Sequence, residues 1–119
     1  IINEDIIIVV MLETPKAILN VEEIASVPGI DVLLVGTNDL CMEMGIPGEF
    51  NHNDVKVAYK KVIQACNNNN ILPGMGGVYD ETLMHEYIDL GMKFILSGSD
   101  LSFLVKGAED RLNNLKNKG

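Results

Sequence analysis

Residues 6–17 read IIIVVMLETPKA, and this stretch decides the fold. The run from Ile6 to Leu12 is continuously apolar and rich in β-branched side chains, which is typical of a strand buried on both faces. Thr14 is a good helix N-cap, and Pro15 suits the first helical position. Apolar residues then recur at helical spacing as far as Ala25, and Pro28-Gly29 ends the pattern. The stretch therefore predicts a strand, a tight loop and a helix.

The same order of elements recurs along the rest of the chain. Strands are predicted at 31–36 (DVLLVG), 71–78 (ILPGMGGV) and 93–97 (KFILS). Helices are predicted from Asn38 or Asp39 to Gly45, from Asn53 to the Asn run at 67–70, from Asp80 to Gly91, and from Ser99 onward. In the last helix the apolar residues are expected to face inward, namely Leu101, Leu104, Val105, Ala108, Leu112 and Leu115.

Alternating strands and helices with short loops predict an α/β fold with a parallel sheet. Two architectures fit this pattern: an open doubly wound sheet, or part of a (β/α)₈ barrel. Periodicity does not choose between them. About four units would make half of a barrel and leave two strand edges unpaired. Because the chain begins at Ile1 and reaches a strand almost at once, we expect a piece of a longer protein.

Bulk properties limit the classes of partner. The 119 residues suit one domain, predicted to span 1–119. A formal charge of −8 and a pI of about 4.5 disfavour nucleic acids and anionic membrane surfaces. No apolar run approaches the roughly 20 residues of a membrane span, and no secretory signal pattern is present. Cys41 and Cys66 form no disulfide framework, so we expect reduced thiols and a cytoplasmic location.

Two carboxylates follow predicted strands at the sheet edge where α/β proteins carry their sites. Glu13 comes after the first strand and Asp39 after the second, one strand–helix unit apart. Carboxylates on neighbouring loops can share a divalent cation, and Mg²⁺ typically takes one or two of them. Two alternatives remain open: a solvated Glu13 at the end of its strand, and an Asp39 that serves the dipole of its helix.

Glycine-rich segments lie beside these carboxylates. In GTND, residues 36–39, Gly36 permits a tight turn, and the N–H groups that follow can bind a carboxylate or phosphate at a helix start. An ordinary strand-to-helix turn is the alternative. GMGG, residues 74–77, lacks dinucleotide-binding spacing and indicates either close approach of a ligand or plain turn chemistry. Of the two histidines, His52 is expected to cap a helix and His85 to be exposed on one.

The string MLETPKAILNVEEIASVPGIDVLLVGTNDLCMEMG, residues 11–45, resembles the HpcH/HpaI aldolase family of metal-dependent class II pyruvate aldolases. The segments PGMGGVYD (73–80) and YIDLGMKFILSGSDLSFL (87–104) extend the likeness, in the same order and spacing, over nearly the whole chain. The resemblance implies the C-terminal half of a (β/α)₈ TIM barrel of about 250 residues. It is specific for the family, but it does not choose among the family's members.

The resemblance also implies roles for residues. Glu13 and Asp39 match the two protein ligands of a divalent metal, Mg²⁺ or Mn²⁺ with Co²⁺ possible. Gly36, Thr37, Asn38 and Asp39 match the segment that holds the carboxylate of pyruvate, although Pro is common at the position of Thr37. The family's catalytic Arg and His come from the N-terminal half, and Arg111 cannot replace that Arg. No catalytic residue is therefore assigned in this chain.

The implied reaction is cleavage of a 4-hydroxy-2-oxo acid to pyruvate and an aldehyde, here by an incomplete barrel that we expect to be inactive or weak alone. Two alternatives stay open. One is a CoA-thioester lyase of the citrate lyase β type, against which the lack of an evident basic patch counts weakly. The other is a non-catalytic barrel fragment that binds a partner chain or a 2-oxo acid. We expect a homo-oligomer, or assembly with the missing half of the barrel.

Overall fold

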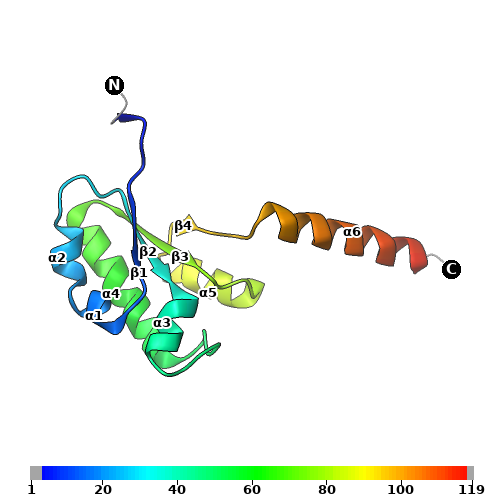
Figure 1. Ribbon diagram of the computed structural model, residues 1–119, viewed down its shortest axis with the longest axis horizontal. Helices are drawn as coiled ribbons and strands as arrows, with labels where there is room; N and C mark the ends of the chain where they lie inside the picture. The colour runs from blue at the N-terminus through cyan, green and yellow to red at the C-terminus, as the bar shows by residue number, and fades with distance from the viewer. Residues whose placement is uncertain (1–3, 118–119) are drawn as a thin grey trace.

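Four parallel strands in chain order form the sheet of this protein in a computed structural model, which describes residues 4–117 (Figure 1). They are β1 (Val9–Leu12), β2 (Val32–Gly36), β3 (Leu72–Gly76) and β4 (Phe94–Ile95). The order is β1-β2-β3-β4, and each neighbouring pair is parallel. A doubly wound sheet reverses its strand order at a switch point, whereas a barrel adds strands in sequence. The observed order therefore favours the barrel architecture.

Within residues 4–117, six helices follow the strands or lie between them. They are α1 (Pro15–Leu19), α2 (Val21–Ala25), α3 (Thr37–Glu43), α4 (Asn53–Asn69), α5 (Glu81–Leu90) and α6 (Asp100–Lys116). The single helix predicted after Thr14 is in fact two short helices, α1 and α2. The break is at Asn20, whose φ of −95° and ψ of 13° lie outside the helical range.

Four predicted helix caps are confirmed by specific hydrogen bonds, whereas α3 begins at Thr37, with Gly36 as its N-cap, and not at Asn38 or Asp39. The Thr14 hydroxyl accepts from the Ala17 N–H, and His52 Nδ1 accepts from the Asp54 N–H. Asp80 caps α5 by accepting from the Leu83 N–H, and Ser99 caps α6. Asn70 ends α4 in the left-handed conformation that Asn tolerates, with φ of 55°. These short polar residues thus decide where the strand–helix units are divided.

Helices α1 to α5 cover one face of the sheet. Residues at matched positions in parallel strands point to the same side, so Leu12, Val35, Met75 and Ile95 form a row. This row packs in the core with residues of α1 to α5. The neighbouring row, Met11, Leu34, Gly74 and Phe94, points to the opposite face. On that face Met11, Leu72 and Leu96 remain largely exposed.

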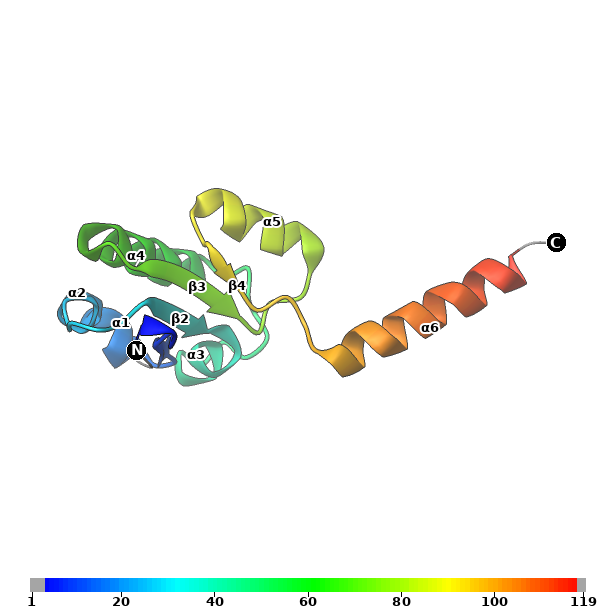
Figure 2. The same ribbon diagram turned by 90° about the horizontal axis from the view of Figure 1, so that it is seen from above.

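Two expectations about burial are wrong. Of the predicted strand 6–12, only Val9–Leu12 is a strand, and only Leu12 is buried, because no helix of residues 4–117 covers the other face. The apolar residues of α6 do not face inward: no residue of this helix is buried. Figures 1 and 2 both show α6 extending away from the sheet, which gives the molecule extents of 59 × 42 × 23 Å. No helix within residues 4–117 combines the length and hydropathy needed to cross a membrane.

Candidate functional site

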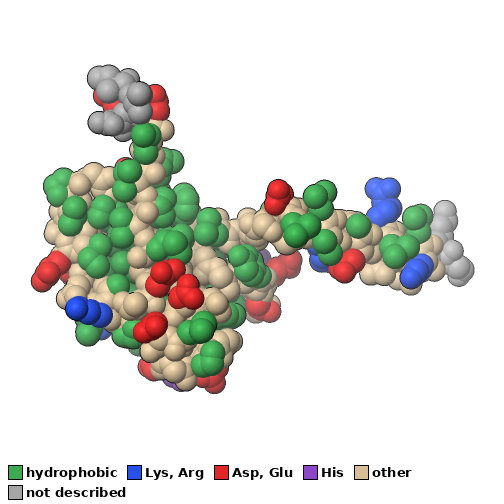
Figure 3. All heavy atoms as spheres, in the orientation of Figure 1, with side chains coloured by type: hydrophobic (Ala, Val, Ile, Leu, Met, Phe, Trp, Pro, Cys, Tyr) green, Lys and Arg blue, Asp and Glu red, His purple; other side chains and the backbone are tan. Residues whose placement is uncertain are grey.

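A hollow of about 160 Å³ lies at the carboxyl ends of the strands, and the predicted site residues come together there. Glu13 and Asp39 both line it, as do Gly36, Thr37 and Asn38. Four further residues line the hollow: Met11 and Leu96, which were not predicted, and Gly76 and Gly77 of the GMGG segment, for which close approach of a ligand was one interpretation. Figure 3 shows acidic side chains gathered beside apolar surface in the region of α3. The hollow thus combines carboxylates, backbone and apolar walls.

The floor of the hollow is a pair of glycines on adjacent strands. Gly36 of β2 is paired with Gly76 of β3, and Glu13 and Leu96 flank them from the ends of β1 and β4. A Cβ at Gly36 would lie 2.8 Å from Glu13 Cγ and 2.9 Å from Glu13 Oε1. A Cβ at Gly76 would lie 3.1 Å from Leu96 Cδ1. The two glycines therefore leave the space into which the flanking side chains lean.

Gly36 has a different role from the one predicted. Its φ of −79° is open to any residue, so the turn into α3 does not require glycine. What requires glycine is the close approach of Glu13, since the contacts to Cγ and Oε1 are shorter than real Cβ atoms make. Because Gly36 has no side chain, the Glu13 carboxylate can lie beside the start of α3.

The start of α3 forms the rim of the hollow. Gly36 occupies the N-cap position and provides no side-chain hydrogen bond to the first turn. Asp39 lies in that first turn, where its charge is favourable to the helix dipole. Gly77, with φ of 85°, brings the end of β3 close, so that a Cβ there would be 3.3 Å from the Asn38 nitrogen. Only glycine satisfies both this backbone conformation and this spacing.

Below the rim, Thr37 is fixed by a buried hydrogen bond that the sequence did not reveal. Thr37 is fully buried, and its Oγ1 lies 2.5 Å from the hydroxyl oxygen of Tyr59 in α4. Tyr59 is also fully buried, and burial raises the pKa of its phenol. The Tyr59 ring packs against Tyr87 of α5, with ring centroids 4.3 Å apart. Neither Tyr59 nor its contact with Thr37 was predicted, because a pairing of residues 22 positions apart leaves no local signal in the sequence.

The histidines and the single arginine lie elsewhere. His52 caps α4 as predicted, and His85 is exposed on α5, where it lines a different pocket. Arg111 lies on the projecting helix α6 and is exposed. Within residues 4–117 none of the three is among the residues that line the hollow. The side chains that line it are thus two carboxylates with Thr, Asn and apolar neighbours.

The donor set of the hollow fits a hard divalent cation of the open type. Among residues 4–117 no cluster of three or more His, Cys, Asp or Glu side chains is placed to hold a metal ion. Glu13 and Asp39 are two oxygen donors lining one small space. Mg²⁺ commonly uses one or two protein carboxylates and completes its shell with water and substrate oxygens. The pair therefore fits an ion of this kind and does not fit a closed structural site.

Comparison with known proteins identifies the family of this chain. Residues 1–107 match the family model described as HpcH/HpaI aldolase/citrate lyase. The chain belongs to the HpcH/HpaI aldolase/citrate lyase family. A 4-hydroxy-4-methyl-2-oxoglutarate aldolase of Chaetomium globosum is 38% identical over 105 residues, which are 87% of this chain and 39% of the relative. A 4-hydroxy-2-oxo-heptane-1,7-dioate aldolase of Klebsiella pneumoniae is 33% identical over 107 residues, 90% of this chain and 40% of the relative.

Solved structures agree with the family assignment. The crystal structure of an HpcH/HpaI aldolase from Desulfitobacterium hafniense superposes with a TM-score of 0.81 at 26% identity, covering 98% of this chain and 45% of that one. A family protein from Burkholderia cenocepacia gives a TM-score of 0.84 at 27% identity, covering 96% and 44%. The chain thus spans about two fifths of the length of the curated relatives it matches, and its fold is a partial TIM-type barrel.

Proposed function

We propose that this chain carries the metal-binding and 2-oxo-acid-binding part of a class II aldolase that cleaves a 4-hydroxy-2-oxo acid to pyruvate and an aldehyde. One observation carries the proposal: Glu13 leans over Gly36 into the same hollow that Asp39 lines. The aldolase names of the relatives support the same reaction class. Because those relatives are more than twice as long, the activity is proposed for the complete barrel.

In this proposal Glu13 and Asp39 hold a divalent cation, Mg²⁺ or Mn²⁺ with Co²⁺ as a further candidate. When bound, the cation supplies positive charge that polarises the 2-oxo group of the substrate. The first-turn N–H groups of α3, at Thr37, Asn38 and Asp39, bind the carboxylate of the substrate. The small volume of the hollow suits a ligand of few heavy atoms, such as a three-carbon 2-oxo acid.

The reaction itself breaks the bond between C3 and C4 of the substrate. The 4-hydroxyl loses its proton as the bond breaks, C4 leaves as the aldehyde, and C3 gains a proton to give the methyl group of pyruvate. We assign the groups that move these protons to the part of the barrel absent from this chain. Met11 and Leu96 form apolar walls at two sides of the hollow.

Partners and location complete the proposal. We propose that the chain works within a larger assembly, either with the remaining part of its barrel or as a homo-oligomer, because one face of its sheet carries exposed Met11, Leu72 and Leu96. The two cysteines, Cys41 and Cys66, are free and buried. Reduced, buried thiols are typical of the cytoplasm, where we place the protein.

The decisive test is Mn²⁺ binding to the whole chain, with and without pyruvate. We expect pyruvate to tighten Mn²⁺ binding, and Glu13→Gln and Asp39→Asn each to abolish that binding. Glu43→Gln is the matched control, because Glu43 is an exposed carboxylate of α3 that does not line the hollow. If Mn²⁺ binding is absent, or if it survives both substitutions, the proposed metal site is wrong.

A further inference from the structure

We infer that Tyr59 is a positioning residue. Through its hydrogen bond to Thr37 it holds residues 36–39, here called the 36–39 turn, and thereby the Asp39 carboxylate. The inference rests on the proposed function, because it concerns the metal that Asp39 would hold. Tyr59 is on α4, does not line the hollow, and touches the turn from below through a single hydrogen bond. It would act on the ligand only through its effect on the turn.

The hydrogen bond joins two buried hydroxyl groups, those of Thr37 and Tyr59. Thr37 and Tyr59 are both 0% exposed, so neither hydroxyl can turn to water. Their oxygens are 2.5 Å apart, and either hydroxyl can donate. When Tyr59 donates, Thr37 is free to donate to the Val35 carbonyl, at 3.5 Å. The Thr37 side chain is thereby tied on one side to α4 and on the other to the end of β2.

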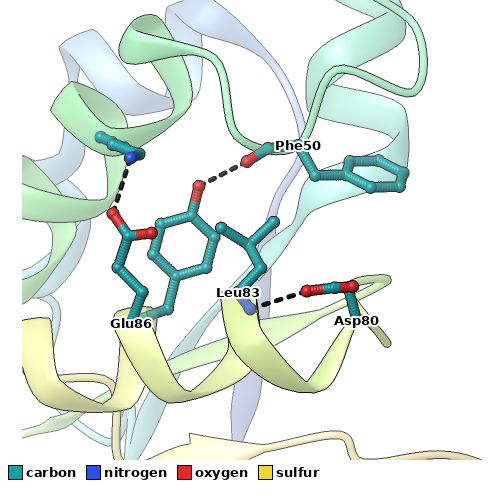
Figure 4. A network of polar contacts seen from close by, with 6 residues as sticks. Phe50, Asp80, Leu83 and Glu86 are labelled. Carbon is teal, nitrogen blue, oxygen red and sulfur yellow. Dashed lines mark hydrogen bonds and ion pairs between the residues drawn. The ribbon is translucent and has the colours of Figure 1, made fainter.

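Tyr59 is itself held from its far side. Its ring packs against the ring of Tyr87, with the two planes tilted by 42°. The Tyr87 hydroxyl in turn donates to the Phe50 carbonyl in the loop between α3 and α4 (Figure 4). The ion pair of Lys56 with Glu86, at 2.6 Å, joins α4 to α5 beside these rings. The aromatic pair thus forms a rigid support between α4, α5 and the loop.

Few side chains of the 36–39 turn itself restrain its position. Gly36 has no side chain to cap α3, and Asn38 and Asp39 are exposed. Thr37 is the one side chain of the turn that is buried. The Thr37–Tyr59 hydrogen bond restrains the turn through this one buried side chain. The position of Asp39, two residues further on, depends on that bond.

The test is Mn²⁺ binding by the whole chain, measured well below its thermal midpoint. We expect Tyr59→Phe and Thr37→Val each to weaken binding about tenfold, the lower end of the usual effect of removing a group that orients a metal ligand. The double variant should lose no more than either single one, because both changes remove the same bond. Thr37→Ser keeps the hydroxyl and should restore most of the Mn²⁺ affinity that Thr37→Val loses. Tyr79→Phe makes the same chemical change at an exposed ring and should have no effect.

Hydrogen exchange in the metal-free chain provides a second readout. Tyr59→Phe should speed exchange at the Cys41 amide, whose helical acceptor in α3 is the Thr37 carbonyl, while the Met84 amide in α5, which donates to the Asp80 carbonyl, exchanges as before. A Tyr59→Phe chain that binds Mn²⁺ as tightly as the wild type overturns this inference and leaves the proposed function intact. A wild-type chain that binds no Mn²⁺ overturns the proposed function itself, and the inference falls with it.

Discussion

Replacing Gly36 by alanine tests the geometry of the hollow most directly. The new Cβ would lie 2.8 Å from Glu13 Cγ, 2.9 Å from Glu13 Oε1 and 3.2 Å from Met11 Cε. All three atoms belong to side chains that can move, and the φ of −79° accepts alanine without strain. We therefore expect Gly36→Ala to displace the Glu13 carboxylate and leave the fold intact.

The size of the effect follows from these distances. Non-bonded carbon atoms prefer a separation of about 3.5–4.0 Å, so Glu13 Cγ has to retreat by about 1 Å. Mg²⁺ and similar ions require their oxygens at about 2.0–2.1 Å, and a misplaced carboxylate can reach this distance only with distortion. We expect Mn²⁺ binding to weaken by about tenfold to a hundredfold, or about 1.4–2.8 kcal/mol. Alanine lowers the conformational entropy of the unfolded chain relative to glycine, which stabilises the folded state by about 0.4–1 kcal/mol. This gain offsets the cost of displacing Glu13.

The assay is Mn²⁺ titration together with thermal unfolding of Gly36→Ala and of a matched glycine variant. Gly107→Ala is the control, because a Cβ at Gly107 in α6 meets nothing within 4 Å. It should bind Mn²⁺ as the wild type does. If Gly36→Ala binds Mn²⁺ with wild-type affinity, the Glu13 carboxylate does not contribute from the position described, and the reasoning fails.

Three other predictions concern stability. Asn70→Ala should cost about 1 kcal/mol in urea unfolding because Asn70 has φ of 55°, whereas Asn70→Gly should cost nothing. Burial raises the pKa of Cys66 from 9.0 to about 11 and that of Tyr87 from 10.0 to about 12, so stability should be complete below about pH 9 and fall as pH rises through 11 to 12. Tyr87→Phe should flatten the upper part of that fall, and an unchanged profile would contradict this. Leu104→Ala on exposed α6 should change the free energy of unfolding by less than about 0.5 kcal/mol, whereas Leu40→Ala in the core should cost about 2–5 kcal/mol. A concentration-dependent loss at Leu104 would instead show that α6 packs on another molecule.

Local signals in the sequence predicted the division into units well. Thr14, His52, Asp80 and Ser99 each act as helix caps, and a cap depends on neighbours within three residues. The burial of β1 and of α6 was predicted wrongly for the opposite reason. An apolar pattern shows which face prefers burial, but it does not show whether anything is present to cover that face. In α6, residues such as Leu104 keep the helical pattern while remaining 71% exposed.

In the candidate site, too, some contacts could be predicted from the sequence and others could not. That Glu13 and Asp39 line the same hollow could be predicted, because the carboxyl ends of parallel strands meet at one edge of the sheet. The floor of Gly36 and Gly76 could not, because it depends on the register between β2 and β3. Nor could the contact of Thr37 with Tyr59, which are 22 positions apart. Pairings of this kind are decided by packing and leave no mark in a single sequence.

The face of the sheet opposite the helices also determines how this chain behaves in solution. With Met11, Leu72 and Leu96 exposed there, two molecules that meet face to face gain by excluding water. Mutual repulsion from the net charge of −8 opposes such encounters at neutral pH. Ammonium sulfate both screens that repulsion and strengthens apolar association, and acidification towards the pI of about 4.5 removes the charge. The colloidal stability of the chain is therefore a matter of charge, and low-salt, mildly alkaline buffers are the conditions in which it should stay dispersed.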